Sequence, residues 1–254
     1  MIKKEIGYLA LVGLPMQRAR EVALIAVFGA LHTVLSLIPG IWRSLMILIL
    51  PLEGIILGPA RGFSAGFIGF AAGWVLRPRG EPIFFGLAEP VGALCAGLMM
   101  RRKWYHVALI YALMLAAFFL HPITSSLPLW TLWNIYAALI CVLAFGFLDH
   151  WKRLSARVRE KALGVAKLSL MLALVALVGI EADVLTRIFI LVPLNGYAIW
   201  GIPAAFLPAA FVEGAFQTPI EAVLSVLTTL MVGVPLLDRL SKMRLWDWEK
   251  LSLK

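Results

Sequence analysis

Long apolar runs separated by short polar turns dominate this sequence, and they strongly limit what the chain can fold into. Hydrophobic residues make up 62% of the chain and charged residues 15%, whereas soluble domains have about 45–50% and about 25%. Most runs come close to the roughly 17 to 25 residues that a helix needs to cross a bilayer. The sequence therefore predicts an all-α, polytopic transmembrane helix bundle of the cell membrane, folded as a single domain over residues 1–254.

The order of runs and turns predicts about eight spans. We expect them at 21–38, 44–57, 62–76, 83–100, 105–121, 130–148, 166–182 and 219–237. Around them we expect a cytoplasmic lead at 1–20, a basic cytoplasmic loop at 149–165 and a cytoplasmic tail at 238–254. With both termini inside, only four of the 23 lysines and arginines lie outside, which follows the positive-inside rule.

Residues 188–212 are apolar but broken by Pro193, Asn195-Gly196, Gly201, Pro203 and Pro208. If this stretch crossed the membrane, the basic tail would lie outside, against the positive-inside rule. We therefore predict an external or re-entrant segment. Because irregular backbone at membrane depth is tolerated only beside protein or a water-filled cavity, it is a candidate wall or lid of a binding site. The alternative is one more span.

Four glycines follow a Gly58-Pro59 turn at spacings of four, three and four residues: Gly62, Gly66, Gly69 and Gly73. These spacings place all four on one face of a helix. In a membrane, small residues let a neighbouring backbone approach closely. We therefore assign these glycines to helix packing.

Motifs for enzymatic chemistry are weak in this sequence. Residues 62–66 match G-x-S-x-G, but that motif needs a strand-to-helix turn with a histidine and a carboxylate nearby. The four histidines have no metal-ligand spacing, and no phosphate-binding loop is present. The basic residues lie in loops and tails rather than on one face with stacking aromatics. We therefore expect no enzyme, no metal or cofactor, and no nucleic-acid partner.

Polar residues within or beside the apolar runs are the best candidates for function, because charge at membrane depth is costly. These polar residues also include Glu53, Arg187 and Glu221. By the predicted topology most of the set lies in the outer half, with tryptophans nearby. The predicted substrate-binding residues are His32, Trp42, Glu89, Trp133, Asn134, Glu181, Asp183, Asn195, Trp200, Glu213 and Gln217. The alternative for any one of them is a structural hydrogen bond between helices or an interfacial charge.

Two stretches in sequence order carry a family resemblance. The first span contains Ala26-Val27-Phe28-Gly29-Ala30, and Gly58-Pro59-Ala60-Arg61-Gly62 leads into the glycine-rich third span. Over residues 20–100 this resembles the substrate-binding S component of energy-coupling-factor (ECF) vitamin transporters. In that family an Ala-x-x-x-Ala pair on the first helix faces the coupling subunit, which Ala26 and Ala30 match. The turn is similar to the family's Gly-Pro-x-x-Gly signature.

The resemblance implies a function and a set of partners. The chain would capture a vitamin or cofactor precursor outside the cell and work with a transmembrane coupling protein and two ATPase subunits. The typical family member has six helices, two fewer than predicted here. The alternative is a self-contained secondary transporter of a small organic solute, a class that often has broken helices at the midplane.

Overall fold

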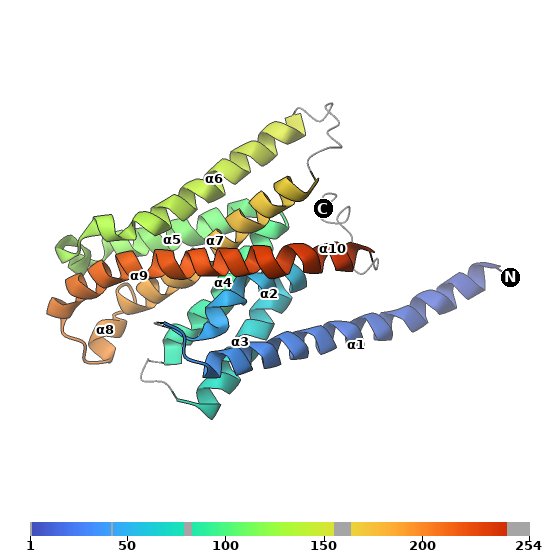
Figure 1. Cartoon of the computed structure of the whole chain (residues 1–254), viewed down its shortest axis with the longest axis horizontal. Coiled ribbons are helices and arrows are strands. Elements are labelled where there is room, and N and C mark those ends of the chain that lie inside the picture. Colours follow the sequence, from blue (N-terminus) through green and yellow to red (C-terminus); the bar gives the residue numbers. More distant parts are fainter. Residues whose placement is uncertain (1, 42, 79–82, 155–163, 243–254) are drawn as a thin grey trace.

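The computed structural model describes residues 2–41, 43–78, 83–154 and 164–242, and these residues form a helical bundle with no β-strand among them (Figure 1). Ten helices are labelled α: α1 Ile2–Leu37, α2 Leu50–Leu57, α3 Pro59–Leu76, α4 Ala88–Met100, α5 Trp104–Leu120, α6 Trp133–Leu154, α7 Gly164–Leu191, α8 Gly196–Ile199, α9 Leu207–Thr228 and α10 Val234–Lys242. Short 3-10 turns lie at η1 Leu45–Leu48, η2 Ile83–Leu87, η3 Pro122–Ser126, η4 Leu129–Leu132 and η5 Ala204–Phe206, and a π-helical stretch at η6 Thr229–Gly233.

Four helical stretches are long and apolar enough to cross a membrane. They are Ile83–Met100, Leu129–Asp149, Lys167–Leu191 and Ala204–Arg239. Two shorter apolar helical stretches, Glu21–Leu37 and Trp104–Leu120, lie beside them in the chain. The all-helical, membrane-type architecture is thus confirmed at this level, while the count of eight spans and the cytoplasmic placement of both termini stay predictions.

The predicted span at 44–57 is divided in the structure. It begins with η1 and continues as α2, which has eight residues and is therefore only about 12 Å long. Pro51 lies in the first turn of α2, where its missing N–H costs little. Gly58 then takes a positive φ of 83°, which reverses the chain into α3. The short α2 packs against α3 and α4 in the interior of the bundle.

The close approach of α2, α3 and α4 depends on glycine. A Cβ atom at Gly62 would lie 2.8 Å from the Cα of Gly54, and one at Gly97 would lie 2.6 Å from the nitrogen of Pro59. Real Cβ atoms do not come this close to backbone, so each position excludes a side chain. The predicted glycine face of α3 is buried at all four positions, against α1, α2 and α4.

The last long helix begins earlier than predicted. α7 continues to Leu191 and α9 starts at Leu207, so the irregular connection is 192–206 rather than 188–212. Pro219, where we expected the final span to start, lies inside α9. A proline leaves the carbonyl four residues earlier without its helical partner. Here the indole N–H of Trp133 donates to that carbonyl, of Ala215, at 3.1 Å.

Helix α1 packs against α3 with one face and is exposed elsewhere. Gly29, His32 and Ser36 are buried where α1 packs against α3. Ala26 and Ala30, beside this buried face, are exposed. The N-terminal part of α1 extends away from the bundle (Figure 1).

Candidate substrate-binding site

A buried histidine links three helices at the centre of the bundle. The Nδ1 atom of His32 on α1 lies 2.8 Å from Oε1 of Glu53 on α2, and its Nε2 atom lies 3.0 Å from Oε2 of Glu89 on α4. All three side chains are buried. A neutral imidazole has a single N–H, and an ionised carboxylate only accepts hydrogen bonds. The His32–Glu53–Glu89 group therefore holds at least two protons.

The glycines of α3 make room for this group. A Cβ atom at Gly69 would lie 2.6 Å from Cγ of His32, and one at Gly66 would lie 3.2 Å from Oε2 of Glu53. The same glycine face that packs the helices thus sets the position of two ionisable side chains. Gly73 similarly faces the side chain of Ser36, one turn further along α1.

Arginine side chains extend the histidine group toward α7 and α9. Nη2 of Arg187 lies 3.4 Å from the second oxygen of Glu89, and its Nε atom lies 3.2 Å from Asp183, one turn earlier on α7. Arg43 pairs with the same Asp183 and donates from Nε to Oε2 of Glu221 on α9 at 2.6 Å. The result is one continuous, largely buried network, whose members come from five helices (α1, α2, α4, α7 and α9) and from the connection before η1.

Arg43 enters the bundle from the connection between α1 and η1. This connection forms a tight turn, in which the Gly40 N–H donates to the carbonyl of Arg43 at 2.7 Å. Burial by itself lowers the pKa of a guanidinium, but Asp183 and Glu221 raise the pKa of Arg43 above its ordinary value. Arg43 therefore stays charged, and it ties the α1–η1 connection to α7 and α9.

Two amide side chains lie in or beside the network on the side of α6 and α9. The Nδ2 atom of Asn134 donates to Glu181 at 2.7 Å and to the hydroxyl of Thr218 at 2.8 Å. The Nε2 atom of Gln217 donates to Glu221 at 3.3 Å. Together with Arg43, these contacts join α6, α7 and α9 around one space.

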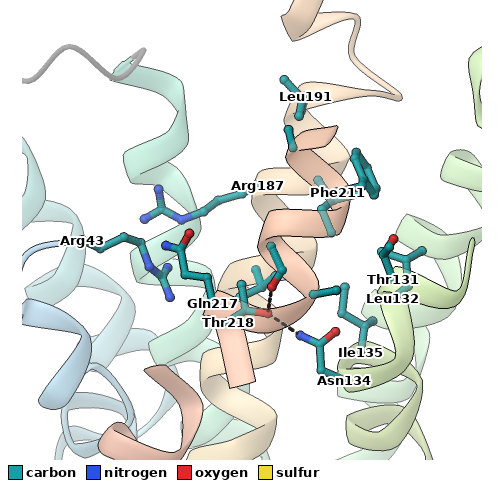
Figure 2. Close-up of a pocket in the computed structure, with 15 residues that line it drawn as sticks. Arg43, Thr131, Leu132, Asn134, Ile135, Arg187, Leu191, Phe211, Gln217 and Thr218 are labelled. Atoms are coloured by element: carbon teal, nitrogen blue, oxygen red, sulfur yellow. Dashed lines mark hydrogen bonds between the residues drawn. The ribbon is translucent and has the colours of Figure 1, made fainter. Parts of the chain in front are cut away.

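A pocket of about 180 Å³ lies in this space, between the first turns of α6, the end of α7 and the first half of α9 (Figure 2). Its apolar walls include Ile135, Val184 and Phe211. Its polar lining residues are Arg43, Thr131, Asn134, Arg187, Gln217 and Thr218. Since an apolar cavity of roughly 150 Å³ is enough to hold benzene, this pocket suits a ligand body of about one ring.

The structure brings six of the predicted site residues into this network. They are His32, Glu89, Asn134, Glu181, Asp183 and Gln217. Trp133 does not line the pocket, and its indole instead bonds the backbone of α9. Trp42 lies outside the described residues.

Three predicted residues lie away from the pocket. Asn195 is exposed and pairs with His121 at 3.1 Å. Trp200 packs edge to face against Phe85, with ring centroids 4.8 Å apart. Glu213 is exposed on α9. The first two lie in the 192–206 connection, none of whose residues line the pocket.

Several network residues were not among the predicted binding residues. Glu53, Arg187 and Glu221 carry the same signal as their partners, a charge in an apolar run. Arg43 and Thr218 carry none, because one is a lone arginine in a short connection and the other is a threonine on a long helix. No metal-binding arrangement of three or more His, Cys, Asp or Glu side chains occurs among the described residues.

Comparison with family models, with curated proteins and with solved structures gives no match to this chain.

Proposed function

We propose that this chain is the substrate-binding membrane subunit of an ECF-type uptake transporter for a vitamin or cofactor precursor. The carrying observation is the exposure of Ala26 and Ala30 on α1. The chain does not use this small-residue pair for its own packing, although the adjoining face of the same helix is buried against α3. Small residues on an open face let another membrane helix approach closely. The pair is therefore suited to a separate coupling subunit.

The pocket also supports this proposal, because it has the features of a substrate-binding site. It is small, mostly apolar and equipped with a few polar groups, which is the usual character of a small-molecule site. It lies at the end of α7, next to the 192–206 connection, for which the charge distribution predicts a position outside the cell. In the proposed function a solute enters here, while the energy for uptake comes from separate ATPase subunits.

The test is copurification of the tagged chain from its native membranes. We expect a polytopic membrane protein together with one or two ATPases, and we expect Ala26→Trp or Ala30→Trp to remove them. Ala112→Trp is the matched control, because Ala112 is exposed on α5 and the same substitution adds the same bulk elsewhere. A wild-type chain that elutes alone, while folded and monodisperse, would contradict the proposal.

A self-contained secondary transporter is the second candidate, and the buried ionisable network favours it. Charged side chains inside a membrane bundle often mark proton or ion pathways. In this reading the His32–Glu53–Glu89 group would bind the coupling proton. Gradient-driven uptake into liposomes that contain only this chain would support the second candidate over the first.

A further inference from the structure

Three basic residues in a row follow α4: Arg101, Arg102 and Lys103. The two arginines differ in how they are paired. The Nη1 atom of Arg102 lies 3.2 Å from a carboxylate oxygen of Asp149. Within the described residues, the guanidinium of Arg101 has neither a carboxylate partner nor a hydrogen-bond acceptor. Arg101 is therefore the uncompensated guanidinium of this group.

The guanidinium of Arg101 lies across the turn that joins α2 to α3. A Cβ atom at Gly58, which takes a positive φ in this turn, would lie 2.8 Å from Cζ of Arg101. The turn has room for the guanidinium only because residue 58 is glycine. Although Arg101 is exposed, this contact holds it against the bundle.

A second guanidinium comes from the first turn of α3. It belongs to Arg61, three residues after Gly58 in the chain. Burial and the like charge of Arg61 together lower the pKa of Arg101. Arg61 itself pairs with Glu21 of α1, whereas no carboxylate of the described chain compensates Arg101. An anion between the two guanidiniums would offset their mutual repulsion.

The residues that follow this basic group have the features of a membrane–water interface. Trp104 and Tyr105 begin α5, and tryptophan and tyrosine are enriched at the depth of lipid headgroups. Tyr105, Leu109 and Leu113 are exposed, and their spacing of four residues places them on one face of α5. An apolar stripe therefore runs from the basic group along α5 toward the middle of the helix.

From the uncompensated guanidinium, its neighbour on α3 and the apolar stripe, we infer that this surface binds an anionic phospholipid. The lipid phosphate would accept N–H bonds from Arg101 and Arg61, because the planar guanidinium matches phosphate oxygens. An acyl chain would follow the stripe on α5. The predicted topology places this end at the cytoplasmic leaflet, where anionic lipids attract basic residues beside membrane spans. The inference goes beyond the proposed function and does not depend on it.

Three probes test the inference on the purified full-length protein in a neutral detergent. They are dioctanoyl phosphatidylglycerol, dioctanoyl phosphatidylcholine and inorganic phosphate: an anionic lipid, a zwitterionic lipid and a free anion. At saturation we expect phosphatidylglycerol to raise the unfolding temperature by about 2 °C or more, and the other two to do less. An equal rise with phosphatidylcholine would assign the effect to the acyl chains alone, and an equal rise with inorganic phosphate would indicate a free-anion site. Either result would overturn the inference.

Variants at Arg101 show whether the response comes from this surface. We expect Arg101→Gln to lower the apparent affinity for phosphatidylglycerol about tenfold, because it removes the charge and the paired N–H donors. Arg101→Lys keeps the charge but loses the planar donor pair, so we expect a smaller loss. Arg77→Gln is the control, because Arg77 is exposed at the other end of α3 and the same positive charge is removed. Equal affinities in Arg101→Gln and Arg77→Gln would overturn the inference.

Discussion

His32 is positioned by the absence of a side chain opposite it. Gly69 on α3 faces the imidazole ring so closely that a methyl group there would overlap it. The ring is held at both nitrogens by buried carboxylates, so it cannot move aside without losing a charged hydrogen bond. By contrast, a Cβ atom at Gly29 on α1 would have its nearest neighbours at 3.5 Å, an ordinary contact distance.

This contrast gives a prediction at the residue scale. Gly69→Ala should destabilise the protein by about 2–4 kcal/mol, because overpacking is added to a strained hydrogen bond to a charged group. Gly29→Ala should be neutral or stabilise by up to about 1 kcal/mol, because alanine favours the helix over glycine. Unfolding midpoints in detergent measure both changes. Equal effects of the two substitutions would show that His32 is not held tightly.

The residues of the site could be predicted only in part, and the reason is visible in Arg43. Charge in an apolar run is readable from sequence, and this signal found His32, Glu89 and Asp183. Which groups pair with one another depends on contacts between distant segments: Arg43 and Glu221 are 178 residues apart. In the sequence Arg43 is a lone arginine just before the predicted span at 44–57, whereas in the folded chain it is largely enclosed and links α7 to α9.

At the scale of elements, α9 shows how a distant side chain preserves a helix. Pro219 is normally a reason to end a helix, and we predicted a span that begins there. The break does not occur, because the indole of Trp133 on α6 donates to the carbonyl of Ala215 that Pro219 cannot reach. Helix propensity depends on neighbouring residues in the chain and takes no account of a hydrogen-bond donor on another helix. The start of α9 was therefore not predictable from sequence. The glycine face of α3 was predictable, because it depends only on spacing.

The same contact yields a prediction for the element. Trp133→Phe should cost about 1 kcal/mol or more, because the Ala215 carbonyl loses its partner in an apolar setting. In a Pro219→Ala background the backbone N–H of residue 219 can restore the helical bond, so the same substitution should cost much less. Trp130→Phe, at a tryptophan 56% exposed three residues earlier, is the control. A cost that stays the same in both backgrounds would assign Trp133 a different role.

At the scale of the whole molecule, the bundle has two opposite ends, and α5 runs from one to the other. Lys103 precedes α5, which runs from Trp104 to Leu120. His121, just after α5, bonds to Asn195 beside α8. Since 17 helical residues rise about 25 Å, Lys103 and α8 lie near opposite ends of the bundle. The pocket lies nearer to the end of α8, so the orientation of the chain decides from which side a ligand enters.

The orientation can be measured with single cysteines in a Cys95→Ala, Cys141→Ala background, which removes both native thiols. Ile199 on α8 is 72% exposed, and Lys103 is exposed at the other end. With basic loops inside, Ile199→Cys should react with a membrane-impermeant maleimide in intact cells, and Lys103→Cys only after permeabilisation. The opposite pattern would turn the pocket toward the cytoplasm and contradict capture from outside. Because the two positions report on opposite ends of the bundle, failure of labelling at both would indicate poor access and not a third orientation.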